Sequence, residues 1–176
     1  MGNSYPGNYD NGVGPMDQTG LFAYEAKGVI ALRVYCPLRV DRRHWQTERV
    51  SIGDVPFRLQ FLVNRDDTER EQAKARLHCC GDRLELQEWM AEVVCTFSVL
   101  AWRRKPGASD LEEFEEDKER SRRQTVEHSF RDQCLECSVD FGPLTELLSE
   151  RYAFSQNGSL LIEAAIELRH THKFVK

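Results

Sequence analysis

The sequence lacks the features that would place it at a membrane or outside the cell. No apolar run approaches the roughly 20 residues that a membrane-spanning helix needs. The first twenty residues have no basic start and no apolar segment, so they predict no secretory signal. The opening residues resemble a myristoylation signal, but Pro6 stands where Ser or Thr is expected. We therefore expect an intracellular protein, cytoplasmic or nuclear, with no membrane partner.

An excess of basic charge is also absent. The chain has 24 Lys and Arg residues against 29 Asp and Glu residues, a net charge of −5. Proteins that bind nucleic acid usually carry a basic surface, so this balance predicts no nucleic-acid partner.

Recognisable catalytic motifs are missing as well. The chain contains no G-x-S-x-G, P-loop or H-E-x-x-H pattern, and its five histidines are scattered. We expect no catalytic residue, and therefore not an enzyme. A thiol dyad of Cys80 or Cys95 with His128 stays open as an alternative.

Six cysteines in a chain with no predicted secretory signal are expected to be reduced thiols. Cys134 and Cys137 form a C-x-x-C pair, a spacing found in zinc and redox sites. Residues i and i+3 of a strand point to opposite faces, so these two thiols are not expected to share one metal ion. Cys36 and Cys95 are interpreted as small core residues. We expect no metal and no cofactor, while a thiol- or zinc-dependent protein remains an alternative.

The rest of the chain is rich in alternating apolar and polar residues. Residues 55–63 place Val, Phe, Leu, Phe and Val on one side and Arg58 and Gln60 on the other. Further strands are predicted at 28–38, 75–80, 90–102, 134–141 and 159–170. This pattern predicts an all-β fold, an antiparallel β-sandwich of about eight strands, as one domain over residues 23–173. Residues 1–22, rich in Gly, Pro and Asn, are predicted to be a disordered tail.

Two segments interrupt the strand pattern. Residues 142–154 keep Leu144, Leu147 and Leu148 on one face after Pro143, which predicts one short helix. Residues 105–127 carry a dense acidic run and then a basic one, which predicts a long charged loop inserted in the domain.

The final third carries a family resemblance. Residues 127–168 resemble the C-terminal half of a MATH (meprin and TRAF homology) domain, and the earlier strands follow the same order over residues 28–172. The matching positions are Phe130, Phe141, Leu144, Leu147, Asn157, Gly158, Leu160, Ile162 and Glu163. The resemblance implies a TRAF-like β-sandwich that recognises short extended peptides, closest in style to the MATH-BTB adaptor branch.

The resemblance also implies a partner-binding groove, but with altered chemistry. The implied groove residues are Arg76, Cys95, His128, Cys134, Leu135, Glu136, Cys137 and Ser138. Glu136, Cys137 and Ser138 replace the branch's Trp, Gly and Phe. Arg76 and Cys95 replace aromatic residues, and His128 replaces Tyr. Aromatic anchors supply most of the affinity of a small groove, so the branch's usual peptide is not expected to bind. The groove would read polar or charged groups, or it is a surface no longer used.

These observations lead to one main hypothesis and two alternatives. The main hypothesis is a non-catalytic module that recognises a partner protein or short peptide, as the substrate-reading arm of a ubiquitin-ligase adaptor working with a BTB/cullin-type assembly. The first alternative is a scaffold or homo-oligomer that uses its sheet edge and charged loop. The second is the thiol- or zinc-dependent protein described above.

Overall fold

The computed structural model describes residues 25–35, 42–80, 89–107, 113–131, 134–149, 154 and 158–173. The described chain is almost entirely antiparallel strand with one short helix, which confirms the predicted fold class. Its elements are β1 (Ala26–Tyr35), β2 (His44–Gln46), β3 (Val50–Ile52), β4 (Val55–Arg65), β5 (Glu71–Cys79), β6 (Trp89–Val99), β7 (Trp102–Arg104), β8 (Phe114–Glu116), β9 (Arg122–Arg131), β10 (Glu136–Pro143), α1 (Leu144–Leu147) and β11 (Ser159–Lys173). Within these ranges no helix is long and apolar enough to span a membrane.

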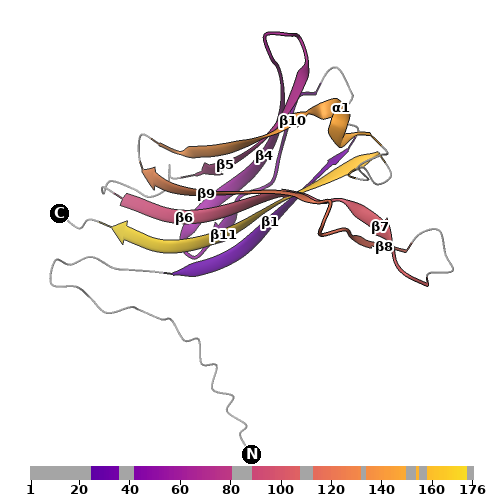
Figure 1. Ribbon diagram of the computed structural model, residues 1–176. Helices are drawn as coiled ribbons and strands as arrows, with labels where there is room; N and C mark the ends of the chain where they lie inside the picture. Colours follow the sequence, from indigo (N-terminus) through magenta and orange to yellow (C-terminus); the bar gives the residue numbers. More distant parts are fainter. Residues whose placement is uncertain are drawn as a thin grey trace, which may run out of the picture.

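The strands form two stacked sheets and a small ribbon. Sheet A has the order β1-β11-β6-β9. Sheet B has the order β10-β5-β4-β2, with β3 also pairing with β4. Strands β7 and β8 form a separate two-stranded ribbon at one end. Figure 1 shows sheet B lying across sheet A, so the inner faces of both sheets enclose the core.

The core follows from the alternation in the sequence. Along β4, every second side chain from Val55 to Val63 is buried against sheet A, while the residues between them are half-buried on the outside. Phe57 meets Phe130 of β9 edge-on, with ring centroids 5.6 Å apart. Each fully buried side chain of this size stabilises the fold by about 1.5–3 kcal/mol.

The segment predicted as a long charged loop, 105–127, is partly strand. It contains β8 and the start of β9, while residues 108–112 lie outside the described part. The charged side chains of β9 are accommodated because β9 is an edge strand whose outer face meets solvent. In the ribbon, opposite charges form ion pairs, as between Arg103 and Glu115 at 2.9 Å. Asp117 makes the turn before β9, since its carboxylate accepts the backbone N–H groups of Glu119 and Arg120. The predicted loop is therefore shorter than expected, because residues 114–116 belong to β8 and residues 122–127 to β9.

The predicted helix is present but is a single turn. Gly142 and Pro143 complete β10, and α1 then buries Leu144 and Leu147. The predicted tail, residues 1–22, lies outside the described residues.

Candidate functional site

The groove residues implied by the sequence lie in three separate places. Glu136 and Ser138 are exposed and Arg76 half-buried, all on the outer face of sheet B. Cys95 and Cys137 are buried in the core. His128 and Cys134 lie together at the seam where the edges of β9 and β10 meet, and Leu135 packs against the core beside them. The predicted set therefore does not form one groove.

The outer face of sheet B carries a continuous block of polar side chains, which we call the polar face: Arg58, Gln60, Arg76, His78, Glu136 and Ser138. The strand registers align these residues in two rows. Arg58 lies opposite His78, and His78 opposite Glu136; in the next row Gln60, Arg76 and Ser138 are neighbours in the same way. Their sequence neighbours Leu59, Leu77 and Cys137 point into the core, and this alternation turns the polar residues outward.

The carboxylate of Glu136 lies close to both Arg76 and His78 on the polar face. A guanidinium nitrogen of Arg76 and Nδ1 of His78 each lie 3.4 Å from its carboxylate. The side chain of Glu136 is 47% exposed, so water screens these pairs and they contribute at most about 1 kcal/mol. The pairs orient the side chains more than they stabilise the fold.

Three buried polar atoms on this face have no hydrogen-bond partner among the described residues. They are Nε of Arg58, Oε1 of Gln60 and Nδ1 of His78. The contact of His78 with Glu136 brings opposite charges together when the ring is protonated, but its geometry does not make a hydrogen bond. Buried polar atoms without a partner are rare in folded proteins, and each costs about 1–3 kcal/mol.

The three atoms lie next to one another on the polar face. In the part of the chain that the structure describes, all three lie on neighbouring residues of β4 and β5 rather than scattered over the fold. Arg58 Nε requires an acceptor, and Gln60 Oε1 requires a donor. A carboxylate beside an amide or hydroxyl group would satisfy both.

The seam between the sheets holds a thiol next to an imidazole. Sγ of Cys134 lies 3.4 Å from Nε2 of His128, and the ring of His128 stacks edge-on against Phe130 at 4.7 Å. Burial, and secondarily the positive charge of Arg131, lower the pKa of His128. The ring is therefore neutral at pH 7, and Nε2 shares a hydrogen bond with the thiol. The alternative left open in the sequence paired His128 with Cys80 or Cys95, whereas the thiol beside His128 in the structure is that of Cys134.

The other cysteine of the C-x-x-C pair points into the core. Burial raises the pKa of Cys137 to about 12, and burial also raises the pKa of Cys95. Both thiols therefore stay protonated and unreactive at neutral pH. No group of three His, Cys, Asp or Glu side chains within the described ranges is arranged to hold a metal ion.

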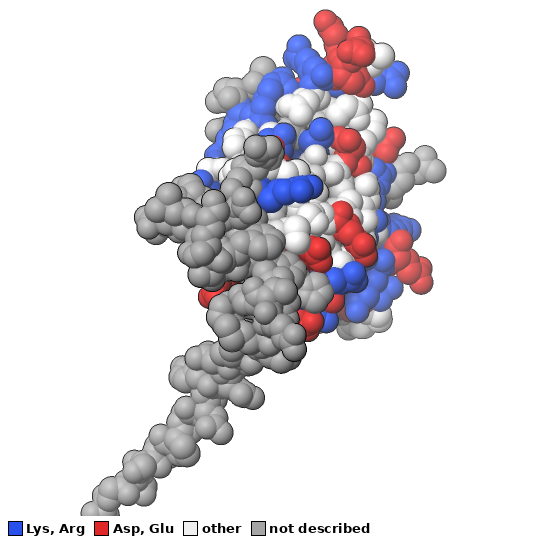
Figure 2. All heavy atoms as spheres, turned by 90° about the vertical axis from the view of Figure 1, so that its left-hand side faces the viewer, with Lys and Arg blue, Asp and Glu red and all other residues white. Residues whose placement is uncertain are grey.

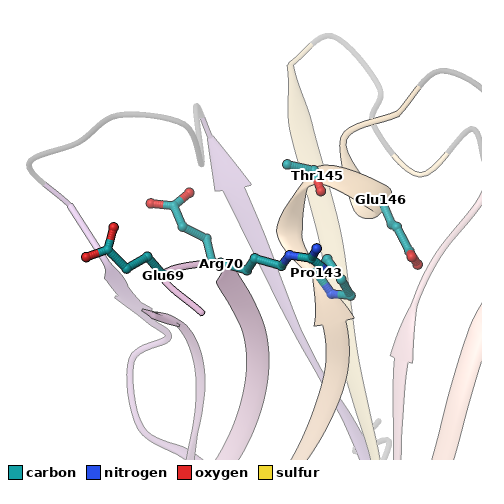
Figure 3. Close-up of a pocket in the computed structure, with 6 residues that line it drawn as sticks. Glu69, Arg70, Pro143, Thr145 and Glu146 are labelled. Atoms are coloured by element: carbon teal, nitrogen blue, oxygen red, sulfur yellow. The ribbon is translucent and has the colours of Figure 1, made fainter. Parts of the chain in front are cut away.

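A hollow of about 490 Å³ lies between the β4–β5 connection and α1. Figure 3 shows Glu69 and Arg70 on one side and Pro143, Thr145 and Glu146 on the other. Two of its carboxylates are already engaged: Glu146 accepts from Arg122 at 2.9 Å, and Glu71 accepts from Arg43 at 2.9 Å. These ion pairs join strands and turns.

Figure 2 shows the face of the molecule that lies at the left of Figure 1. Positive and negative side chains are mixed on this face. In Figure 2, Lys and Arg alternate with Asp and Glu around an uncharged centre, and no broad patch of one sign appears among the described residues.

Comparisons with known proteins leave the family open. No family model matches the chain, and no curated protein matches it. Among solved structures, the Salmonella enterica trimeric lipoprotein SadB matches with 9% identity and a TM-score of 0.34, over 82% of this chain and 60% of that chain. The chain thus spans about 60% of that structure's length, and a likeness this distant carries no inference about function.

Part of the polar face was visible in the sequence. The alternation over 55–63 turns Arg58 and Gln60 away from the core, and Arg76 and Glu136 were implied groove residues. His78 was missed as a member because the pairing of β4 with β5 is needed to bring it beside Arg58.

Proposed function

We propose that the chain is a non-catalytic protein-recognition module that binds an extended, acid-containing segment of a partner protein on its polar face. The observation that carries this proposal is the cluster of three buried polar atoms on Arg58, Gln60 and His78 that find no hydrogen-bond partner in the described part of the chain. A bound segment would satisfy these atoms and recover the free energy that the unbound protein forgoes.

The charges of the face favour an acidic partner. Arg76 is balanced by Glu136, and Lys74 lies 3.7 Å from Asp140. Arg58 makes no ion pair with another described residue, so it is the cation left to bind a carboxylate of the partner. Gln60 lies next to it on the same face of β4, and Ser138 lies two strands away on β10; both supply neutral hydrogen-bonding groups that would fix the register of the segment.

The resemblance to MATH domains supports the same class of function. Three of the implied groove residues, Arg76, Glu136 and Ser138, belong to the polar face, where aromatic anchors are replaced by charged and hydroxyl groups. We extend the proposal accordingly: the bound segment belongs to a substrate that the module presents to a BTB/cullin-type ubiquitin ligase.

A peptide library tests the binding function without a known partner. Immobilised wild-type protein is expected to enrich peptides that contain Asp or Glu from a random display library. The double variant Arg58→Ala/Arg76→Ala is expected to lose this enrichment. Lys27→Ala, which removes a cation from the opposite sheet, is the matched control and should keep it. Equal enrichment by the double variant, or no enrichment by the wild type, would overturn the proposal.

A further inference from the structure

Strand β1 is the long open edge of the sandwich. Its 10 residues pair with β11 on one side and with no described strand on the other. The remaining edges are short or bridged: β2 and β3 have 3 residues each. Across the seam, Arg122 and Gln124 of β9 donate to the carbonyl oxygens of Phe141 and Asp140 on β10, at 2.9 and 2.6 Å. An exposed edge of this length is a template for another strand.

The outward side of β1 exposes two large apolar side chains. Val29 is 59% exposed and Tyr35 is 64% exposed, and these are two of the three large exposed hydrophobic side chains in the described chain. Beside Val29 lies a shallow hollow of about 400 Å³, bordered by Val94, Thr96 and Ala165 of the neighbouring strands. The inward side chains of the same strand, Ile30, Leu32 and Val34, are already buried.

We propose that β1 pairs antiparallel with β1 of a second copy of this chain, with Ala31 opposite Ala31 at a two-fold axis. The two chains would then share one continuous sheet, and each strand would supply the hydrogen bonds that the other lacks. Because the two-fold axis is perpendicular to the sheet, outward side chains face outward side chains and inward ones face inward ones.

The side chains of β1 favour this register. Pairing about Ala31 places Lys27 of one copy opposite Tyr35 of the other, where the ammonium group can lie over the ring. It also places Val29 opposite Arg33, whose aliphatic stem can cover the exposed valine. Val29 and the partner's Tyr35 then become diagonal neighbours, within reach of contact.

The neighbouring register centred on Ile30 is less favourable. It would place Lys27 directly opposite Arg33, and like charges in that position destabilise a strand pair. A shift by a single residue would turn the buried side chains of one copy toward the exposed side chains of the other. Among these registers, the one centred on Ala31 pairs every residue from Lys27 to Tyr35 without opposing like charges.

This inference concerns sheet A and does not rest on the proposed function. The polar face lies on the outer side of sheet B and stays open in the paired form. Failure of the dimer would leave the recognition proposal intact, and failure of peptide binding would leave the dimer intact.

Sedimentation velocity over a range of protein concentrations tests the pairing. The wild type is expected to form dimers as concentration rises. Ala31→Lys would place two ammonium groups face to face at the axis and should weaken self-association about tenfold or more. Ala31 is exposed in the single chain, so this substitution should leave the fold undisturbed. Ala165→Lys, on the neighbouring strand of the same face, is the control and should dimerise like the wild type.

The outcomes separate edge pairing from its alternatives. A wild type that stays monomeric at all concentrations overturns the proposal. A dimer that is disrupted by Ala165→Lys but not by Ala31→Lys would also overturn the proposal. That result would mean that the two copies stack through the outer faces of sheet A instead of pairing through β1.

A cysteine variant tests the register of the paired strands. Under mild oxidation, Ala31→Cys should give a disulfide that joins position 31 of one copy to position 31 of the other, detected by peptide mass spectrometry. Thr125→Cys, on the far edge strand of the same sheet, is the matched control and should give no such crosslink between copies. Crosslinking of the control but not of Ala31→Cys would overturn the assigned edge.

Discussion

Arg58 and His78 lie opposite each other on β4 and β5, and each keeps a buried nitrogen without a hydrogen-bond acceptor among the described residues. Folded proteins seldom tolerate two such atoms side by side. The relationship is explained if a bound partner completes the outer face of sheet B.

The charge of Glu136 should oppose the binding of an acidic peptide. Glu136→Gln removes the carboxylate that Arg76 and His78 share, so the affinity for acidic peptides is expected to rise by up to about fivefold. Arg76→Gln should lower it by a similar factor. Isothermal titration with a peptide from the display selection measures both. Changes in the same direction for the two variants would contradict the assigned roles.

The packing of Phe57 should dominate the stability of the sandwich. Phe57 is fully buried and meets Phe130 edge-on, so Phe57→Ala is expected to cost about 3–5 kcal/mol in the free energy of unfolding. Phe114 lies on the small ribbon and is 37% exposed, and Phe114→Ala should change stability by less than about 1 kcal/mol. Urea unfolding curves compare the two; similar losses would mean that the assigned core is wrong.

Gly28 lies where β1 passes close to β3. A Cβ atom at position 28 would overlap Cδ1 of Ile52, so the end of the Ile52 side chain must shift, and Gly28→Ala is expected to destabilise the fold by about 1 kcal/mol or less. Ile52→Val removes the overlapping methyl group and should restore most of that loss in the double variant. Thermal unfolding of the two single variants and the double variant measures the coupling, and simple additivity would rule out the proposed contact.

Stability should fall at alkaline pH because of the two core thiols. Unfolded cysteine ionises near its ordinary pKa of 9.0, whereas burial raises the pKa of Cys137 to about 12 and also raises the pKa of Cys95. Below pH 9 both states hold the protons, so pH has no effect through these groups. Above pH 9 the unfolded state loses the thiol protons before the folded state does. Each of the two thiols should therefore lower the free energy of unfolding by about 1 kcal/mol per pH unit.

A matched variant isolates this effect from other titrating groups. Cys95→Ala/Cys137→Ala should be less stable than the wild type at pH 7, because it leaves cavities, but its unfolding free energy should decline less steeply between about pH 9 and pH 11. Parallel slopes for the two proteins would show that the buried thiols do not control the alkaline limit.

Thiol reactivity should differ sharply along the C-x-x-C pair. Cys134 is half-buried and lies 3.4 Å from the neutral ring of His128, whereas Cys137 is buried with a raised pKa. Iodoacetamide at about pH 7.5 is therefore expected to label Cys134 before Cys137 or Cys95, as followed by peptide mass spectrometry. His128→Gln should slow the labelling of Cys134. Faster labelling of Cys137 than of Cys134 would contradict the burial assigned to the Cys137 thiol.

Much of the fold could be predicted because the buried strands alternate strictly. Residues 55–63 and 159–170 have an apolar side chain at nearly every inward position, and β4 and β11 were found there. Strand β9 was missed because its burial is weak: only Phe130 is fully buried, and its outer positions carry Arg, Thr and Glu. An edge strand of this kind has the composition of a charged loop, and only its pairing with β6 distinguishes it.

The site was harder to predict than the fold. The resemblance to MATH domains implied that Arg76, Glu136 and Ser138 share a surface, but it also included Cys95 and Cys137, which point into the core. Which face a residue occupies depends on where each strand begins, and a shift of one residue reverses it. The unbonded atoms on Arg58 and His78 depend on side-chain packing across two strands, which no spacing in the sequence encodes.

The most direct test of the recognition account is to map a selected acidic peptide on the isotope-labelled protein by NMR titration. The account predicts that the largest amide shifts fall on the strands around Arg58, Arg76, His78 and Glu136, and that Arg58→Ala weakens them. Shifts confined to β1 and β11, or to the seam at His128 and Cys134, would contradict it and assign binding to another surface.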